Sequence, residues 1–251
     1  MAAPVIELRN VWKTFDENEV LRGISLSLSS GVTLAVMGGS GEGKTVLLRI
    51  IAGLIKPDAG EVLLFGENLV PKSEEALLKI RRRTGFVFQG AALFDSLSVA
   101  ENVAFPLREH TAWSEAAIAE RVDHYLAMVG LAEARDLLPA ELSGGMRKRA
   151  GIARALVREP EVVFYDEPTA GLDPSNARLV GELIAKLREG VCKTAVVVTH
   201  DLDFAALVVD RMAILHEGQI LADGRPEEII ASKDPEVQAF LGGELRVAHA
   251  Q

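Results

Sequence analysis

The stretch Gly38-Gly-Ser-Gly-Glu-Gly-Lys-Thr45 decides the fold of this chain. An apolar run at residues 32–37 leads into it and a helical pattern at residues 46–53 follows it, so strand, glycine loop and helix succeed one another. Glycine lets the backbone wrap closely around phosphate groups and aim its N–H groups at them, and a helix start favours an anion. Average composition produces the pattern G-x-x-x-x-G-K-[ST] in roughly one random chain in a hundred of this length. The stretch therefore predicts a phosphate-binding loop for a nucleotide.

Two residues of this loop have specific expected roles. Lys44 is predicted to bring a positive charge to the β- and γ-phosphates, and the hydroxyl of Thr45 is predicted to bind Mg²⁺. A glycine-rich turn beside a surface lysine is the alternative interpretation. The residues expected to contact the nucleotide are Gly38, Gly39, Ser40, Gly41, Glu42, Gly43, Lys44, Thr45 and Val46.

A second apolar run, at residues 162–165, ends in the carboxylates Asp166 and Glu167. A carboxylate at the end of a rigid strand can hold Mg²⁺, which predicts Asp166 as a metal ligand. Glu167 comes one residue later and is predicted to polarise the attacking water as a general base, close to the γ-phosphate but off the metal. Two acids after a strand are also common in ordinary loops, so this prediction depends on the phosphate loop.

The hydrophobic patterning predicts an α/β fold with an N-terminal antiparallel β subdomain and an inserted α-helical subdomain. Apolar runs at residues 162–165 and 195–198 are typical of buried parallel strands. The tail after Phe240 is expected to be a frayed end. The predicted parts are residues 1–90 (antiparallel subdomain and first part of the nucleotide-binding core), 91–157 (helical subdomain), 158–233 (second part of the core) and 234–251 (C-terminal tail).

Composition limits the classes of partner. A chain of 251 residues suits one or two lobes, and a net charge of -9 disfavours nucleic acid, so no nucleic-acid partner is expected. The single cysteine, Cys192, cannot form an intramolecular disulfide and is expected to be a small core residue in a reducing compartment. Residues 1–7 do not look like a secretion signal, and no long uncharged apolar run predicts a membrane-spanning helix, so a membrane role would be peripheral.

A third motif separates this chain from other proteins with a phosphate loop. Leu142-Ser-Gly-Gly-Met146 opens a helical pattern and precedes Asp166-Glu-Pro-Thr-Ala-Gly-Leu-Asp-Pro174. In this order the motifs resemble those of the ATP-binding subunits of ABC transporters, over essentially the whole chain. The resemblance implies a P-loop NTPase core with a RecA-like parallel sheet, ATP and Mg²⁺ as cofactors, and ATP hydrolysis coupled to transport.

The resemblance also implies roles for residues that carry no such signal alone. It makes Phe15 the aromatic residue that stacks on adenine, Gln89 the glutamine that senses Mg²⁺ and water, and His200 the switch histidine. Without it, the phenylalanine suggests packing, the glutamine a solvated side chain and the histidine a structural residue. The residues that it implies to be catalytic are Glu167, His200, Lys44 and Gln89, and the implied metal ligands are Thr45, Gln89 and Asp166.

In this family two copies pair head to tail. The resemblance implies that Ser143, Gly144 and Gly145 of one copy cover the γ-phosphate on the loop of the other, and that Asp173 lies in the loop between the two sites. Two positions depart from the common pattern. Met146 stands where many members have glutamine, and Glu42 adds local repulsion of phosphate unless its side chain points outward.

Four stretches of the sequence resemble those of the Mla/Mce-type lipid-transport ATPases, a group in which a methionine is expected at position 146. The similar stretches are Gln89-Gly-Ala-Ala-Leu-Phe-Asp95, Asn102-Val-Ala-Phe-Pro-Leu-Arg-Glu-His110, Leu142-Ser-Gly-Gly-Met-Arg-Lys-Arg149 and Asp234-Pro-Glu-Val-Gln-Ala-Phe-Leu-Gly242.

This finer resemblance implies a set of partners: a second copy of the chain, an integral membrane permease and an MCE lipid-binding protein. It places the chain at the cytoplasmic side of the inner or plasma membrane, driving phospholipid transport between membranes. Leu93 and Phe94 would contact the permease, or else pack between core and helical lobe. A polar-solute importer ATPase and a soluble ABC ATPase such as an iron–sulfur assembly ATPase remain the alternatives.

Overall fold

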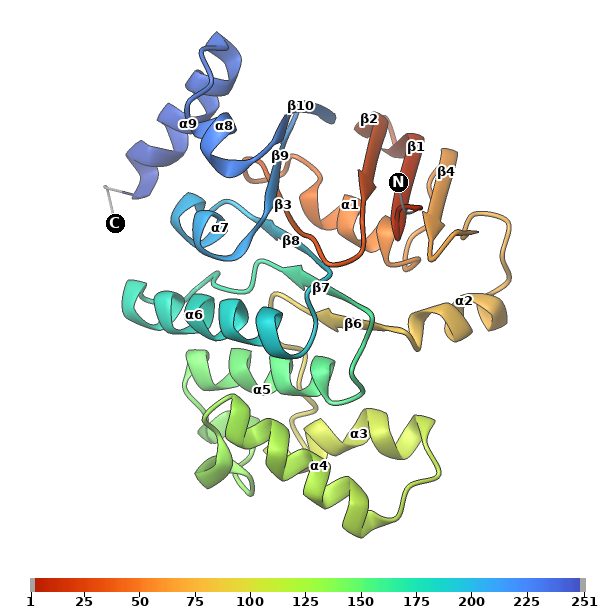
Figure 1. Cartoon of the computed structure of the whole chain (residues 1–251), viewed down its shortest axis with the longest axis vertical. Coiled ribbons are helices and arrows are strands. Elements are labelled where there is room, and N and C mark those ends of the chain that lie inside the picture. The colour runs from red at the N-terminus through yellow and green to blue at the C-terminus, as the bar shows by residue number, and fades with distance from the viewer. Residues whose placement is uncertain (1–2, 249–251) are drawn as a thin grey trace. The chain divides into compact units, whose positions relative to one another are not determined.

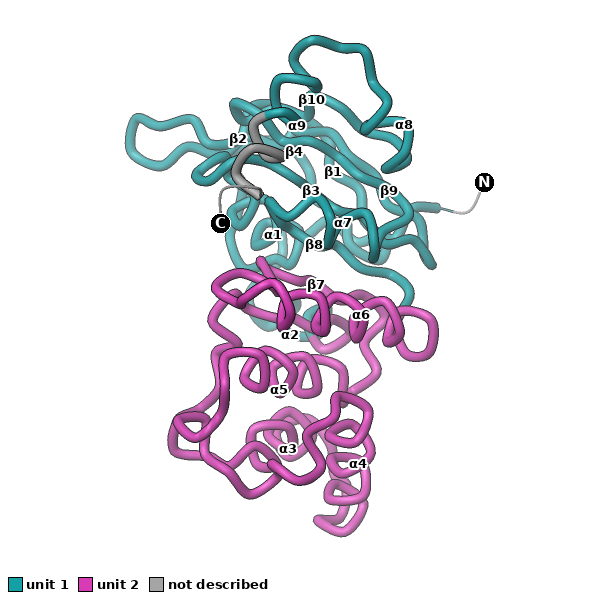
Figure 2. Tube along the Cα trace, turned by 90° about the vertical axis from the view of Figure 1, so that its left-hand side faces the viewer, with its two compact units in different colours: residues 1–81, 193–251 teal, residues 82–192 magenta. Residues whose placement is uncertain are grey.

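The structure, a computed structural model, describes residues 3–248 of the chain. It forms two compact units, which Figure 2 shows in different colours. Unit 1 consists of Met1–Arg81 and Lys193–Gln251, and unit 2 of Arg82–Cys192. Unit 2 is therefore an insertion between two parts of unit 1. The domain boundaries given by the sequence patterning stay a prediction.

Unit 1 contains an antiparallel sheet built around a long hairpin (Figure 1). Strand β1 (Ile6–Phe15) pairs with β2 (Asn18–Leu28), and Asp16 in the turn between them has a left-handed φ of 52°. The sheet has the order β2-β1-β4-β5, completed by β4 (Ala59–Leu64) and β5 (Glu67–Asn68). The predicted N-terminal antiparallel strands are confirmed.

A second group of strands in unit 1 positions the phosphate loop. Strand β3 (Thr33–Met37) pairs in parallel with β8 (Ala195–Thr199) on one side and with β9 (Arg211–His216) on the other. An antiparallel strand, β10 (Gln219–Gly224), pairs with β9. Every residue of β3 and β8 is buried, as expected of parallel strands covered on both faces. The segments after β3, β8 and β9 leave from the same edge.

The C-terminal segment of unit 1 differs from the structure expected from the sequence. The chain end is helical as far as Ala248, so the expected frayed end is wrong for that part, and residues 249–251 lie outside the described residues. Within residues 3–248, the structure contains no helix that is both long and apolar enough to cross a membrane. The helices of this unit are α1 (Lys44–Ile51), α2 (Glu74–Arg81), α7 (Leu202–Val208), α8 (Pro226–Ile230) and α9 (Pro235–Ala248).

Unit 2 joins two parallel strands to a set of helices. Strand β6 (Thr84–Val87) pairs with β7 (Val162–Asp166), and β7 is buried throughout. Cys192, at the end of this unit, is half-buried rather than a core residue as expected. The helical segments are α3 (Val99–His110), α4 (Glu115–Met128), η1 (Ala132–Ala134), η2 (Pro139–Glu141), α5 (Gly144–Leu156) and α6 (Pro174–Gly190). The helical pattern predicted to open at residues 142–146 is confirmed by α5.

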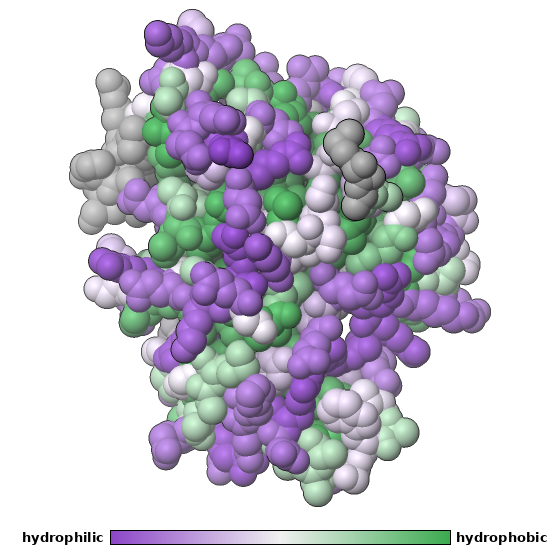
Figure 3. Space-filling model, viewed as in Figure 1, coloured by the Kyte–Doolittle hydropathy of each residue, from purple (hydrophilic) through white to green (hydrophobic). Residues whose placement is uncertain are grey.

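Hydrophilic and hydrophobic residues are interspersed on the face that Figure 3 shows. In unit 2, Phe94 and Phe105 expose 43% and 38% of their area, and their ring centroids lie 4.7 Å apart. Phe94 is thus partly packed within its own unit and partly open, and its contact with a permease stays a prediction.

Candidate functional site

The glycine loop connects β3 to α1 and closely approaches the neighbouring strands. A Cβ atom at Gly38 would lie 2.7 Å from the carbonyl oxygen of Leu215, and one at Gly43 would lie 2.7 Å from Cγ1 of Val20. Gly43 also has a φ of 94°, in the region that favours glycine. Side chains at these two positions would collide with their neighbours, so the loop is bare backbone there.

Lys44 is the first residue of α1, and its side chain is buried. Its ammonium group donates hydrogen bonds to the carbonyl oxygens of Gly38 at 2.8 Å and Gly39 at 3.0 Å. The positive charge is therefore held against the loop, close to a helix start that itself favours anions. Thr45 follows in the first turn, half-buried, with a hydroxyl group of the kind that binds Mg²⁺. This arrangement is suited to a chain of phosphates.

The carboxylate of Glu42 is held by contacts outside the phosphate loop. Its carboxylate accepts a hydrogen bond from the backbone N–H of Glu217 at 2.7 Å, and its second oxygen lies 3.2 Å from Nδ1 of His216. His216 and Glu217 belong to the end of β9 and the turn before β10, within the same unit. The carboxylate thus fastens the phosphate loop to this turn.

Two further predicted residues belong to the same unit as the loop. His200 directly follows β8, and because Met37 pairs with Thr199, His200 and the loop leave the sheet side by side. Phe15 ends β1 with 43% of its area exposed, and the ammonium group of Lys13 lies 5.0 Å from its ring centroid. The hairpin that carries Phe15 reaches the loop through Val20. The structure thus brings the phosphate loop together with these residues in one unit.

A second group of predicted residues gathers in unit 2. Asp166 ends β7 and is 1% exposed, and Glu167 follows with 7% exposed. Gln89 follows β6 and is exposed to solvent. Because β6 and β7 are parallel and Val87 pairs with Tyr165, these polar residues emerge at the same edge. Two buried carboxylates beside an exposed amide form an arrangement able to bind a divalent cation and to orient water.

Lys148 of helix α5 connects these two segments. Its side chain is buried, and its ammonium group donates hydrogen bonds to the carbonyl oxygens of Gln89 and of Glu167, the second at 3.1 Å. Burial lowers the pKa of Lys148 below its usual range, while the Glu167 and Asp166 carboxylates act in the opposite direction. A positive charge therefore sits among the groups that the sequence singled out for hydrolysis.

The start of α5 carries the motif that identified the family resemblance. Ser143 is exposed and caps the helix, accepting a hydrogen bond from the N–H of Met146 at 3.2 Å. A Cβ atom at Gly145 would lie 2.9 Å from Oδ1 of Asn176. The amide of Asn176 in turn donates to Asp173, the cap of α6, at 2.6 Å. The motif and the loop around Asp173 are thus packed on one another.

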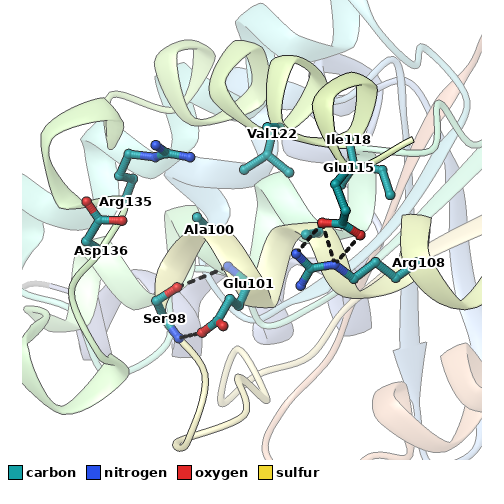
Figure 4. Close-up of a pocket in the computed structure, with 11 residues that line it drawn as sticks. Ser98, Ala100, Glu101, Arg108, Glu115, Ile118, Val122, Arg135 and Asp136 are labelled. Carbon is teal, nitrogen blue, oxygen red and sulfur yellow. Dashed lines mark hydrogen bonds and ion pairs between the residues drawn. The ribbon is translucent and has the colours of Figure 1, made fainter. Parts of the chain in front are cut away.

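A separate cleft of about 320 Å³ lies between α3 and α4 (Figure 4). Arg108 and Glu115 form an ion pair at 2.7 Å on one side of it, and Ser98 and Glu101 form the capping box of α3 below. None of the residues predicted to bind nucleotide lines this cleft. Its walls are part of the helical packing of unit 2.

Sequence reasoning did not find Lys148, Asn176 or His216. Each has a contact with a distant segment that local spacing does not encode: Lys148 with Gln89, Asn176 with Gly145 and His216 with Glu42. The lysine lies in the basic run Arg147-Lys148-Arg149, which is typical of a solvated helix face. Gly151 and Arg154, three and six residues later, share its side of the helix, and that spacing was the available signal.

Comparisons with known proteins place this geometry among characterised relatives. Residues 21–170 match the family model described as ABC transporter. The chain is 44% identical over 260 residues to Protein TRIGALACTOSYLDIACYLGLYCEROL 3, chloroplastic, of Arabidopsis thaliana, over 96% of this chain and 74% of that protein. It is 41% identical over 241 residues to the intermembrane phospholipid transport system ATP-binding protein MlaF of Escherichia coli (strain K12), over 96% of this chain and 90% of that protein. The solved dimeric structure of a post-hydrolysis state of the ATP-binding cassette MJ0796 bound to ADP and Pi has a TM-score of 0.81 and 34% identity, over 88% of this chain and 98% of that chain.

Proposed function

The chain belongs to the ABC transporter family as an ATP-binding and ATP-hydrolysing cassette, and we propose that it drives a membrane permease that moves phospholipid between membranes. The observation that supports phospholipid as the cargo is the 41% identity to MlaF over 96% of the chain, since the name of MlaF is that of a phospholipid transport ATP-binding protein. The match to an ATP-binding cassette with ADP and Pi supports the nucleotide chemistry. The identity to MlaF favours the lipid transporter over a polar-solute importer.

Nucleotide binding in this proposal starts from the loop of unit 1. Residues 38–46 hold the phosphates through backbone N–H groups, with Lys44 as the point charge that its bonds to the loop carbonyls already place there. Phe15 stacks on the adenine ring, for which its exposed face is available. Glu42 takes no direct part, because its carboxylate is bonded to the turn after β9.

The donor set fits Mg²⁺, which prefers oxygen ligands from carboxylate, hydroxyl and amide groups. Thr45, Gln89 and Asp166 would hold the ion, and the burial of Asp166 at the end of a buried strand gives it a rigid ligand. When bound, Mg²⁺ neutralises negative charge on the phosphates.

Hydrolysis in this proposal uses Glu167 as the base that takes a proton from water. Its carboxylate is almost fully buried, which keeps it close to one position and removes competing bulk water. Gln89 and His200 orient the water and the γ-phosphate, and Lys44 stabilises the negative charge that develops there. These roles follow the family resemblance residue by residue.

The proposal needs partners. A second copy supplies the start of α5, with Ser143, Gly144 and Gly145, to the γ-phosphate bound by the first copy, and the capped helix start suits an anion. The dimeric MJ0796 structure supports such pairing. The permease receives the chain at the cytoplasmic side of the membrane, and an MCE lipid-binding protein completes the complex. Phe94 is a candidate contact for the permease because part of its ring is open.

The role of Glu167 can be tested by Glu167→Gln. We expect ATP binding to persist and turnover to fall by roughly 100-fold or more, because the amide cannot accept the proton of water. Steady-state ATPase assays and nucleotide titration measure the two effects. Glu161→Gln is the matched control, since Glu161 pairs with Arg83 at the exposed start of the same strand. Sustained hydrolysis by Glu167→Gln would show that another group is the base.

The cargo can be tested by purifying the chain in detergent from its source membrane. We expect a permease and an MCE protein to be identified by mass in the same complex, and extraction to release phospholipid above the amount carried by an unrelated membrane protein in the same detergent. Recovery of a soluble solute-binding protein without lipid would favour the polar-solute importer. Recovery without any permease would favour a soluble ABC ATPase.

A further inference from the structure

One face of α5 lies along the segment that begins with Gln89. Lys148, Gly151 and Arg154 follow one another at three-residue spacing, which places them on one side of the helix. A Cβ atom at Gly151 would lie 3.2 Å from Cβ of Ala91 and 3.3 Å from its carbonyl oxygen. The helix therefore approaches this segment closely at its middle, with a cationic side chain on each side of the contact.

Both cations hold backbone rather than carboxylates. The ammonium group of Lys148 donates to the carbonyl oxygens of Gln89 and Glu167. The guanidinium group of Arg154 donates to Ala91 at 2.8 Å and to Ala92 at 2.7 Å. Three hydrogen bonds from these two side chains thus fix residues 89–92. Of the two cations, Lys148 also bonds to the segment that carries Glu167.

The backbone that they hold is in an unusual conformation. Ala91 and Ala92 have φ angles of 61° and 49°, and Glu167 has a φ of 46°. Residues other than glycine rarely adopt this region, and such strain persists only where surrounding contacts determine the conformation. Lys148 contributes such a contact to Glu167 directly, and to Ala91 and Ala92 through the neighbouring Gln89.

We propose that Lys148 is a positioning residue for ATP hydrolysis, which fixes the backbones of Gln89 and Glu167 relative to each other so that the water-orienting amide and the base act at one phosphate. The inference rests on the proposed function, in which these two residues carry the chemistry. Lys148 itself contacts neither nucleotide nor water in this role. Through Lys148, the segment after β6 and the segment that carries the base are bonded to the same helix.

A purely structural role for Lys148 would give a different result. An anchor that only stabilises the fold would change the amount of folded protein and ATP binding together. A positioning residue changes kcat while the affinity for ATP stays nearly constant, because the hydrogen bonds of Lys148 go to Gln89 and Glu167 in unit 2 and the phosphate loop belongs to unit 1.

The test is Lys148→Met in the full chain purified with its membrane partners. We expect kcat to fall roughly 10- to 100-fold, with KM for ATP within about threefold of the wild-type value, because small misplacements of catalytic groups have effects of this size. The matched control is Arg149→Met on the same helix, where the lost side chain also donates to two carbonyl oxygens, those of Val129 at 2.8 Å and Gly130 at 3.1 Å. That variant should keep kcat within about twofold once corrected for folded protein.

A second measurement uses the Glu167→Gln background. There Lys148→Met should reduce the residual single-turnover rate by less than it reduces kcat in the wild-type background, because the base, one of the two groups that it positions, is already disabled. If Lys148→Met does not fold, Lys148→Gln takes its place with the same criteria. A loss in the Glu167→Gln background as large as the loss in the wild-type background would indicate a structural role and would overturn the inference.

The remaining outcomes separate this inference from the proposed function. A kcat for Lys148→Met within about twofold of wild type, with turnover lost in Glu167→Gln, contradicts the positioning role alone. Equal losses in Lys148→Met and Arg149→Met also contradict it. Full turnover in Glu167→Gln contradicts the proposed function, and the positioning role with it.

Discussion

Among single residues, Glu42 belongs to the phosphate-loop motif, but its contacts with residues outside the motif determine where its charge is held. Its carboxylate is bonded to the N–H of Glu217 and lies beside His216. A charge held in this way is turned toward the β9–β10 turn, and its pairing with a backbone donor reduces its effect on a bound phosphate. We therefore expect Glu42 to stabilise the shape of the loop more than it repels a bound phosphate.

This interpretation gives an expected result for Glu42→Ala. The dissociation constant for ATP should increase roughly 2- to 5-fold, because the loop loses a partly exposed contact of about 1 kcal/mol or less. Titration with a fluorescent nucleotide measures the change. Glu17→Ala is the control, since it removes the same charge from the exposed β1–β2 turn of unit 1. Tighter binding by Glu42→Ala would mean that the carboxylate repels the nucleotide.

The sequence predicted the identity of candidate residues better than their contacts. Lys44 and Thr45 belong to a motif of fixed local spacing, so their order along the chain specifies them. Local spacing does not specify Lys148 in this way, because it is one of three consecutive basic residues, Arg147-Lys148-Arg149. It differs from its neighbours by its burial, which arises when α5 packs against residues 89–92 and 167. Contacts between distant segments depend on packing, which local patterns do not contain.

At the scale of helices and strands, the sequence predicted elements with a strong hydrophobic pattern and missed short strands with a weak one. Helices α1 and α5 and the buried strands β3, β7 and β8 overlap with patterns found in the sequence. Sequence analysis does not assign β6, which has four residues, or β9. These strands depend on pairing with β7 and with β3, which are far away in the sequence.

Helix α4 is fixed in unit 2 by an aromatic residue with a polar end. Tyr125 is buried, and its hydroxyl lies 3.4 Å from a carboxylate oxygen of Glu159, which also pairs with Arg121 at 2.8 Å. Burial raises the pKa of Tyr125 to about 12, Arg121 acts against this increase, and Glu159 adds to it. The folded protein therefore favours the protonated phenol.

The pH dependence of stability follows from this direction. The folded pKa lies above the unfolded value of about 10, so the contribution of Tyr125 is complete below pH 10 and is lost as the pH rises toward 12. Tyr125→Phe should cost less than about 1 kcal/mol at pH 7, and above pH 10 wild type should lose stability relative to it by at most about 1.4 kcal/mol per pH unit.

Urea unfolding of both proteins between pH 7 and pH 11 measures the difference. Tyr165, the other tyrosine, is present in both proteins, so its titration cancels in the comparison. Parallel stability curves for wild type and Tyr125→Phe would show that the phenol does not titrate with a raised pKa.

For the whole molecule, the family and the α/β class were predictable, because the three motifs occur in order along the chain and the comparisons confirm the family. The predicted helical insertion spans residues 91–157, whereas the compact unit spans Arg82–Cys192 and includes β6, β7 and α6. The contacts of α5 account for this larger unit, since its side chains bond to the segments that follow both strands.

Helix α5 therefore combines two functional features within 13 residues. One is its capped start at Ser143, and the other is the face that contains Lys148 and Arg154. Each residue of a helix turns the chain by about 100° and advances it by about 1.5 Å. One residue added or lost between Gly145 and Lys148 would rotate the ammonium group away from Gln89 and Glu167 while the cap stayed in place. Evolution can therefore exchange side chains along this helix freely at exposed positions, but insertions and deletions within it should be absent among functional descendants of this sequence.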